Sequence, residues 1–136
     1  MGSIGIPCAP RVRVAPVRDT HEPSLYDLFH PHGGEDDNDI DFYLELAEGA
    51  GGPVLELGAG TGRSLLPLAR AGFSCVALDS SARMLAGLRE HLDREEPELR
   101  DRVKVVRAHM QDFAFEERFG LIQIPQRGFL YNLEDQ

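Results

Sequence analysis

The sequence predicts an α/β fold in which helices pack on a doubly wound parallel sheet. Short apolar runs of strand length alternate with segments of helical period, and the connections between them are short. One apolar run, residues 54–57, ends in Gly58, Gly60 and Gly62 and is followed by a leucine-rich helical segment. The next run ends in an acid, Asp79. A strand, a glycine turn and a helix in this order form the cofactor-binding corner of a Rossmann-like sheet.

Composition indicates one globular domain of ordinary polarity. The 136 residues include 14 basic and 23 acidic ones, and the resulting net charge of −9 disfavours nucleic acid as a partner. No apolar run approaches the roughly 20 residues of a membrane span, and no signal-peptide pattern is present. We therefore expect a cytoplasmic protein without a membrane partner. Cys75 lies in a predicted strand, where it is expected to act as a small hydrophobe in a reducing compartment.

The segment before the glycine turn predicts a leader and two helices. Residues 1–20 combine prolines and arginines without a sustained period, so they are predicted to be a flexible leader and the domain to cover residues 21–136. A short amphipathic helix capped by Ser24 is predicted over 24–29, with apolar positions at Leu25, Leu28 and Phe29. An acidic run, which suits a helix start, precedes a second helix with one apolar face formed by Ile40, Tyr43, Leu44 and Ala47.

The segment after the glycine turn predicts two further helices and three further strands. Residues 64–71 form a helix whose buried face is Leu65, Leu66, Leu68 and Ala69. Residues 73–79 form a strand, and Ser80 or Ser81 caps the next helix. That helix carries a core stripe of Met84, Leu85, Leu88 and Leu92. A polar connection at 95–98 leads to strands over 103–107 and 119–125, and such alternation requires parallel strands with right-handed crossovers.

The residues around the glycine turn narrow the ligand to an adenosine cofactor. Arg63 stands where a dinucleotide fingerprint has its third glycine, and the absence of a following Lys-Ser/Thr pair excludes a P-loop. Glu56 lies two residues before Gly58 at the mouth of the strand, where a carboxylate suits an ammonium or sulfonium group. A solvated or locally paired acid is the alternative for Glu56. Asp79 can accept hydrogen bonds from both ribose hydroxyls, in a dinucleotide or in another adenosine cofactor.

Three motifs carry a resemblance to a known family. They are Glu56–Gly62, Leu78-Asp79-Ser-Ser-x-x-Met84-Leu85 and Met110–Phe113. In this order they resemble the class I S-adenosylmethionine-dependent methyltransferases. Within these, the chain is similar to the small-molecule group that includes N-methyltransferases acting on amino sugars. Tyr26-Asp27 also resembles that group's N-terminal helix, whose tyrosine closes over the methionine end of the cofactor. The resemblance runs from about Tyr26 to Gln136.

The resemblance implies S-adenosylmethionine as the cofactor and a set of residues that bind it. Glu56 would hold the amino group of the methionine part, directly or through water, and Asp79 would bind the ribose. Gly58 and Gly60 would contact the methionine part, with Ala59 between them in the same turn. The remaining implied contacts are Tyr26 over the methionine end, Ser80 and Met84 beside the adenine, Met110 on its flank, and Pro125 and Phe129 lining the pocket.

The sequence departs from the family pattern at two places. His109 stands where the family usually has an acid that accepts from the adenine amino group, and a surface histidine is the alternative interpretation. The family's sheet has seven strands, whereas this sequence predicts four. We therefore expect a fragment, a truncated product, or a half that is completed by another copy or a partner chain covering the open sheet edge.

Methyl transfer to a nitrogen or oxygen of a small molecule is the activity that the resemblance implies. Such a reaction depends mainly on placing donor and acceptor in near-attack geometry. No catalytic residue is assigned, although Tyr26, His30 and Tyr131 are candidate bases, and no metal is predicted. A second hypothesis is a non-catalytic cofactor-binding fragment or interaction module. A nicotinamide oxidoreductase is the third, which Arg63 and Glu56 disfavour.

Overall fold

The structure is a computed structural model that describes residues 19, 22–32 and 38–125. The predicted leader lies outside the described residues except for Asp19, and so do Phe129 and Tyr131. Along the chain the elements are α1 (Pro23–Phe29), α2 (Asn38–Ala50), β1 (Val54–Leu57), α3 (Leu65–Arg70), β2 (Cys75–Asp79), α4 (Ala82–Leu92), α5 (Pro97–Arg100), β3 (Val103–Arg107) and β4 (Leu121–Gln123).

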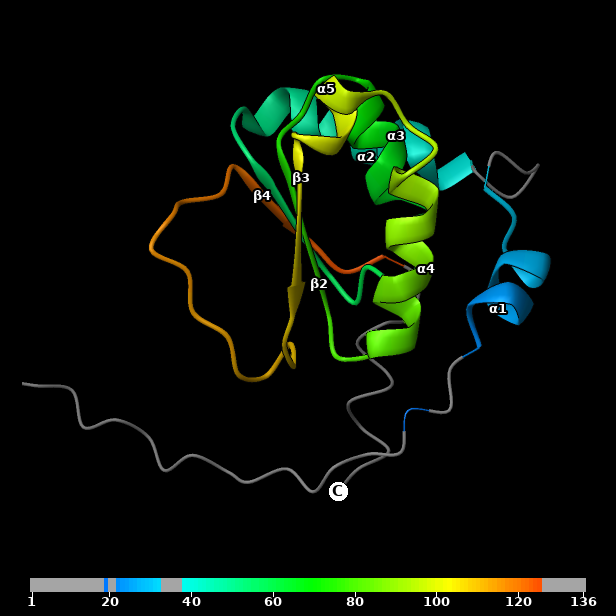
Figure 1. Cartoon of the computed structure of the whole chain (residues 1–136). Helices are drawn as coiled ribbons and strands as arrows, with labels where there is room; N and C mark the ends of the chain where they lie inside the picture. Colours follow the sequence, from blue (N-terminus) through cyan, green and yellow to red (C-terminus); the bar gives the residue numbers. More distant parts are fainter. Residues whose placement is uncertain (1–18, 20–21, 33–37, 126–136) are drawn as a thin grey trace, which may run out of the picture.

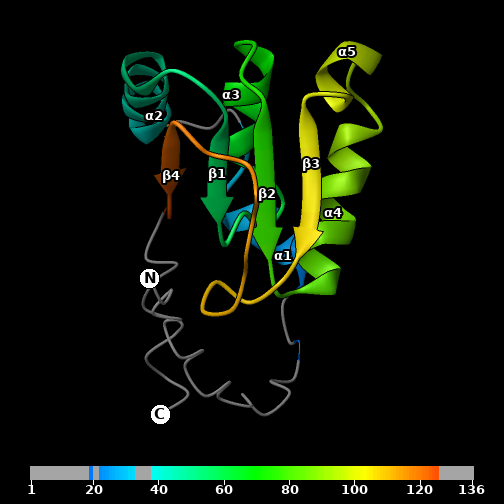
Figure 2. The ribbon, with the colours of Figure 1, turned by 90° about the vertical axis from the view of Figure 1, so that its left-hand side faces the viewer.

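The strands form a parallel sheet in the order β3-β2-β1-β4. Val54 of β1 is in register with Cys75 of β2 on one side and with Leu121 of β4 on the other. Figures 1 and 2 show that all four strands run in the same direction, so their carboxyl ends lie at one edge of the sheet. The chain reverses its direction of winding between β1 and β4, and this is the position at which open α/β sheets bind ligands. The predicted α/β fold class is confirmed.

Helices and a long connection cover the two faces of the sheet. Helices α2 to α5 lie on one face (Figures 1 and 2), and their apolar side chains pack with alternate residues of β1 and β2, among them Val54, Cys75 and Ala77. The intervening residues of these strands face the other way: Leu55, Leu57, Val76 and Leu78. Phe115 and Phe119 from the connection between β3 and β4 pack against this second cluster. The two faces of β1 and β2 are therefore both apolar, as parallel strands require.

Most predicted elements are present, with small shifts at their ends. The Ser81 hydroxyl accepts the backbone N–H of Met84, so Ser81 is the cap of α4. The apolar faces predicted for α2, α3 and α4 are buried or partly buried. Residues 95–98 are not simply a polar connection, because α5 begins at Pro97 and buries Leu99.

The prediction for the first helix is wrong in two respects. Helix α1 begins at Pro23 with Glu22 at its N-cap, and the Ser24 hydroxyl donates to the Glu22 carboxylate instead of capping the helix. Proline is favoured at a first helical position because its missing N–H would have no partner there. The expected apolar face is exposed: Leu25, Leu28 and Phe29 are 56%, 71% and 71% accessible. Helix α1 has no buried residue, and Pro23 at its start packs against α4 at Gly87.

The edge of the described sheet at β4 leaves apolar surface accessible. Ile122 on β4 is 56% exposed.

Cys75 on the interior strand β2 is buried, and burial raises the pKa of its thiol to about 12, as expected for a small core hydrophobe. Within the described part of the chain, no helix is long and apolar enough to cross a membrane.

Candidate cofactor site

The glycine turn lies at the carboxyl edge of the sheet and needs glycine for its conformation. Gly58, Gly60 and Gly62 have φ values of 70°, 57° and 90°, which side-chain-bearing residues rarely adopt. The backbone N–H groups of Gly58 and Ala59 both donate to the Leu78 carbonyl, at 2.8 and 3.0 Å. These bonds hold the turn against the end of β2.

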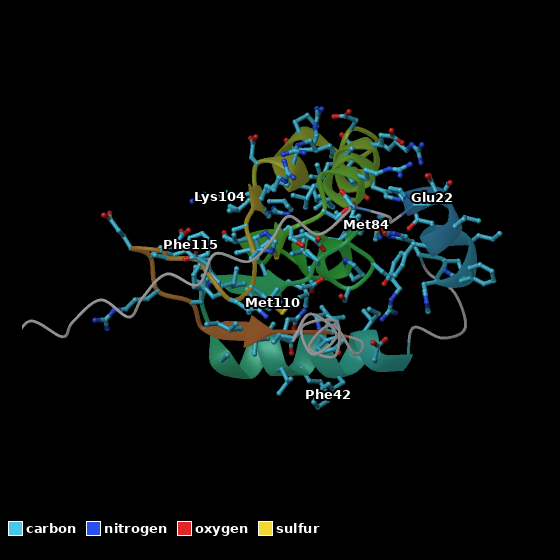
Figure 3. The ribbon with its side chains drawn as sticks, turned by 90° about the horizontal axis from the view of Figure 1, so that it is seen from below. Glu22, Phe42, Met84, Lys104, Met110 and Phe115 are labelled. Atoms are coloured by element: carbon cyan, nitrogen blue, oxygen red, sulfur yellow. The ribbon has the colours of Figure 1, made fainter. Side chains whose placement is uncertain are left out.

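Two methionines flank the turn. A Cβ atom on Gly58 would lie 3.3 Å from Met110 Cε, and one on Gly60 would lie 3.1 Å from Met84 Cε. Figure 3 looks onto this edge of the sheet and shows Met84 on α4 and Met110 in the segment after β3. The structure thus brings together four of the residues predicted to bind the cofactor. Thioether side chains are flexible and can adapt to a flat ligand beside them.

Asp79 connects the glycine turn to the start of α4. Its Oδ2 accepts the backbone N–H of Gly60 at 2.8 Å, and its Oδ1 accepts that of Ser81 at 2.8 Å. A carboxylate offers about four acceptor sites, so each oxygen keeps capacity for another donor such as a ribose hydroxyl. The neighbouring Ser80 is exposed, and its carbonyl accepts from Arg107 Nε at 3.2 Å.

Glu56 on β1 is buried in the interior of the fold. It is 1% exposed, and its two oxygens accept from Ser64 Oγ at 2.9 Å and from Gln123 Nε2 at 2.6 Å. Burial raises the pKa of the Glu56 carboxyl to about 7, although hydrogen bonds from Gln123 and Ser64 and the charge of Arg63 oppose the rise. The locally paired acid, given above as the alternative, describes this placement. Its predicted contact with the cofactor stays a prediction.

Gln123 is a site residue that the sequence analysis missed. It lies on β4 in register with Glu56, and its side chain is 95% buried (5% exposed). Its Oε1 has no hydrogen-bond partner among the described residues, although a buried carbonyl oxygen normally has one. A lone amide within the apolar run 121–124 was the available signal, because a polar side chain in a buried strand needs a partner.

Arg63, which replaces the third glycine of a dinucleotide fingerprint, holds α2 against the turn. Its guanidinium is 5% exposed and donates to both carboxylate oxygens of Asp39, at 3.1 and 2.8 Å. These bonds from Arg63 outweigh partial burial and hold the pKa of the Asp39 carboxyl below its usual value. Asp39 belongs to the acidic run that suits the start of this helix, and it also has a specific partner in Arg63.

Helix α1 reaches the glycine turn through a polar contact. Thr61 Oγ1, in the turn, donates to Asp27 Oδ1 at 2.6 Å. Tyr26, the residue beside Asp27, is partly buried, and its ring centroid lies 4.9 Å from that of His30. The remaining predicted site residues differ in exposure: Ala59 and Pro125 are buried and His109 is exposed.

These residues fit an adenosine cofactor. Asp79 retains acceptor capacity beside the turn, the glycines allow close approach of a ligand to the backbone, and Gln123 Oε1 is a buried acceptor without a described donor. The arrangement supplies hydrogen-bond acceptors and flexible apolar surface, and it offers no nucleophile or base of established role. It can bind and orient a cofactor at the carboxyl edge of the sheet.

Comparisons with known proteins agree with this assignment. The family described as "Methyltransferase domain" matches residues 54–135. The glycopeptide N-methyltransferase MtfA is 36% identical, with a TM-score of 0.58, covering 63% of this chain and 40% of MtfA. The CcbJ methyltransferase from Streptomyces caelestis is 32% identical, with a TM-score of 0.56, covering 68% of this chain and 39% of CcbJ. Streptomyces venezuelae DesVI is 22% identical, with a TM-score of 0.59, and the match covers 74% of this chain and 41% of DesVI. At this identity the likeness shows a shared fold. No curated protein matches.

The strand order, the glycine turn and the acid at the end of β2 define an α/β domain for an adenosine cofactor. The match over 54–135 covers more than half of the chain, and this chain belongs to the methyltransferase domain family. S-adenosylmethionine is the cofactor of that family, and MtfA has been crystallised with S-adenosylmethionine, S-adenosylhomocysteine and sinefungin. The chain spans about two fifths of the length of MtfA and CcbJ.

Proposed function

We propose that this domain acts in methyl transfer from S-adenosylmethionine to a nitrogen or oxygen of a small molecule. The observation that carries the proposal is the convergence of Gly58, Gly60, Asp79, Met84 and Met110 at the carboxyl edge of the sheet. The similarity to MtfA, a glycopeptide N-methyltransferase, supports a nitrogen acceptor within this class. The surplus of acidic residues supports a small-molecule acceptor over a nucleic acid.

The residues around the glycine turn have roles in this proposal that follow from their positions. The bound cofactor would supply a methyl group already activated by the sulfonium, so the protein mainly has to bind and orient. Asp79 would accept from the ribose hydroxyls while its bonds to Gly60 and Ser81 keep it in place. Met84 and Met110 would adjust around the adenine. Helix α1 would place Tyr26 near the turn through the bond between Asp27 and Thr61.

Glu56 has a supporting role in the proposal. Its oxygens already accept from Ser64 and Gln123, so it fixes the start of α3 and the strand β4 on either side of the turn. Gln123 Oε1 is the better candidate acceptor for the ammonium group of the cofactor, because it is buried and has no described donor. This assignment makes the Glu56–Gln123 pair the unit that recognises the methionine end.

Titration calorimetry with S-adenosylhomocysteine tests the proposal. We expect the full chain to bind this product more tightly than NAD. Asp79→Asn should weaken binding about tenfold or more, because a hydrogen bond to a charged group contributes about 1.5–3 kcal/mol. Asp93→Asn is the matched control, since Asp93 is an exposed aspartate just after α4. Circular dichroism of each variant separates loss of binding from loss of fold.

The outcomes separate the three hypotheses. Binding of S-adenosylhomocysteine together with its formation from S-adenosylmethionine and an amine or hydroxyl acceptor supports methyl transfer. Binding without turnover on any acceptor supports the non-catalytic cofactor-binding module. Tighter binding of NAD would favour the oxidoreductase, and absence of binding by a folded chain would refute the functional assignment of the glycine turn.

A further inference from the structure

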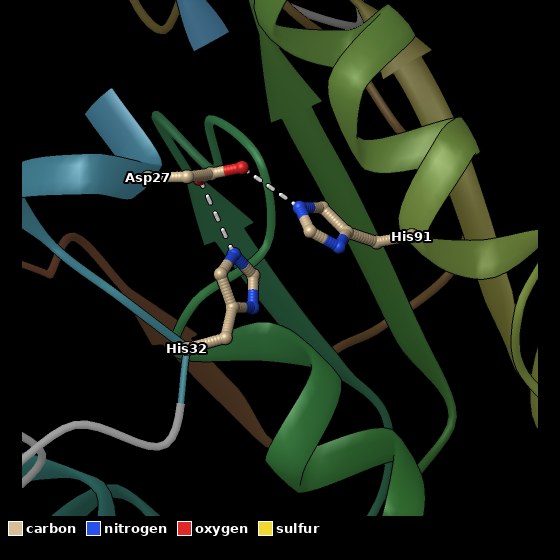
Figure 4. A group of neighbouring side chains, drawn as sticks. All are labelled: Asp27, His32 and His91. Carbon is tan, nitrogen blue, oxygen red and sulfur yellow. Dashed lines mark hydrogen bonds and ion pairs between the residues drawn. The ribbon is translucent and has the colours of Figure 1, made fainter. Parts of the chain in front are cut away.

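A group of two histidines and an aspartate lies beside the cofactor site, and the proposed function gives its histidines no role. Asp27 comes from α1, His32 from the segment after α1, and His91 from the last turn of α4. The ring atom His91 Nε2 lies 2.8 Å from Asp27 Oδ2, and His32 Nε2 lies 3.5 Å from Asp27 Oδ1. Figure 4 shows both imidazoles pointing a ring nitrogen at the one carboxylate.

Each of the three side chains offers one ligand atom. Those atoms all lie within 4.8 Å of one another. Zinc bonds of about 2.0–2.2 Å in tetrahedral geometry place neighbouring ligand atoms about 3.4 Å apart. The separations of 2.8 and 3.5 Å run to different oxygens of Asp27 and lie on either side of that value. A rotation of the Asp27 carboxylate that turned one oxygen toward both rings would bring three ligand atoms onto one ion.

The two imidazole rings lie close to each other beside one carboxylate. The two imidazole centroids are 4.3 Å apart, and two protonated rings at that distance would repel each other. Neutral imidazole is the form that binds metal ions.

We propose that Asp27, His32 and His91 form a binding site for one divalent transition-metal ion of the zinc type. Two imidazole nitrogens and one carboxylate oxygen suit zinc and similar borderline ions, whereas Mg²⁺ and Ca²⁺ prefer sets of oxygen ligands. Three protein ligands leave a fourth position for water or another donor. The metal would replace the hydrogen bond between His91 and Asp27.

The surroundings of the carboxylate support the same assignment. Thr61 Oγ1 donates to Asp27 Oδ1 at 2.6 Å and also lies 3.3 Å from His32 Nε2. A hydroxyl donating to a ligating carboxylate is a typical outer partner, because it fixes the orientation of the ligand. Helix α1 has no buried residue, so a metal joining it to α4 would add to the contact that Pro23 makes with α4 at Gly87.

A bound metal ion would also affect the cofactor site, through α1. Thr61 belongs to the glycine turn and Tyr26 precedes Asp27, so an ion bound here would fix α1 relative to both. The site itself stands independently of methyl transfer, because its three ligands are separate from the residues assigned to the cofactor. A chain that fails to bind S-adenosylhomocysteine could still bind zinc.

The test is titration of zinc chloride alone into the full chain, prepared without a histidine tag and stripped with a chelator. We expect one zinc ion per chain. His32→Gln, His91→Gln and Asp27→Asn should each weaken zinc binding tenfold or more. His30→Gln is the matched control, because His30 is an exposed histidine at the end of α1 outside the group, and it should bind zinc as the wild type does. Mg²⁺ should not compete.

Two further measurements keep the result clear if one variant folds poorly. Cobalt(II) should give the visible absorption of a tetrahedral site in the wild type and in His30→Gln, and His32→Gln should lose it. Zinc should raise the melting temperature of the wild type, and His32→Gln should not respond. A folded His32→Gln or Asp27→Asn variant that binds zinc with wild-type affinity would overturn the proposal. So would a folded wild-type chain that binds no zinc, or one that binds Mg²⁺ as tightly as zinc.

Discussion

Replacing Glu56 by glutamine should change how the stability of the domain depends on pH. Glu56 is 1% exposed, and its carboxyl pKa is about 7 in the fold against 4.5 in solvent. The folded chain therefore holds this proton more tightly than the unfolded chain does. The stabilisation from the protonated form is fully present below pH 4.5, and it is lost as the pH rises through about 7.

The magnitude follows from the two pKa values. A shift from 4.5 to about 7 corresponds to about 3.4 kcal/mol in full, and about 2.5 kcal/mol of this falls between pH 5 and pH 8. Glu56→Gln keeps the shape of the side chain and stays neutral, so the variant avoids this loss. The free energy of unfolding of the variant, minus that of the wild type, should therefore rise by about 2.5 kcal/mol from pH 5 to pH 8.

Urea unfolding at four pH values from 5 to 8 measures this difference. Taking the difference between variant and wild type removes the contributions of all other titrating groups. Glu45→Gln makes the same chemical change at an exposed position on α2 and should follow the wild-type profile. A difference for Glu56→Gln that stays constant over this range would refute the reasoning, because it would mean that the buried carboxyl does not titrate there.

Two further predictions concern the glycine turn and its support. Gly60→Ala should lower the free energy of unfolding by about 1–2 kcal/mol because of its φ of 57°, with further cost from the Met84 methyl 3.1 Å from the new Cβ. Gly49→Ala is the matched change in an open part of α2, and it should instead raise the free energy of unfolding by about 0.5–1 kcal/mol. If thermal unfolding showed the same change in stability for both variants, the conformational argument would be contradicted. Asp39→Asn should lower the free energy of unfolding by about 1–3 kcal/mol, because it weakens the bidentate pair with the buried Arg63. If the variant unfolded at the same urea concentration as the wild type, the pair would contribute nothing to stability.

Local sequence signals predicted the elements that carry strong periodicity or special turns. The apolar runs, the leucine-rich helical faces and a serine cap at 80 or 81 depend on neighbours within a few residues. The structure confirms them, with Ser81 as the cap. The glycine turn was predictable for the same reason, because its φ values leave glycine as the favoured residue. The start of α1 was not predicted correctly, since Pro23 and Ser24 compete as start signals and proline prevailed.

The polar contacts that shape the site could not be read from the sequence. Glu56 and Gln123 are adjacent only because parallel pairing places β4 beside β1, and that pairing joins distant parts of the chain. The same holds for Arg63 with Asp39 and for Asp27 with His91. None of these pairs has a fixed sequence spacing, so no local pattern identifies them.

By itself, the sequence determined the class of fold and the class of cofactor. Both follow from short-range rules: hydrophobic period, glycine conformations and an acid at the end of a strand. Only the tertiary structure decided that Glu56 is a buried, hydrogen-bonded acid and that ligand atoms of Asp27, His32 and His91 lie within 4.8 Å of one another. The physical reason is that burial and charge proximity arise when distant segments pack together, and these determine the pKa values and ligand geometry on which the site's chemistry depends.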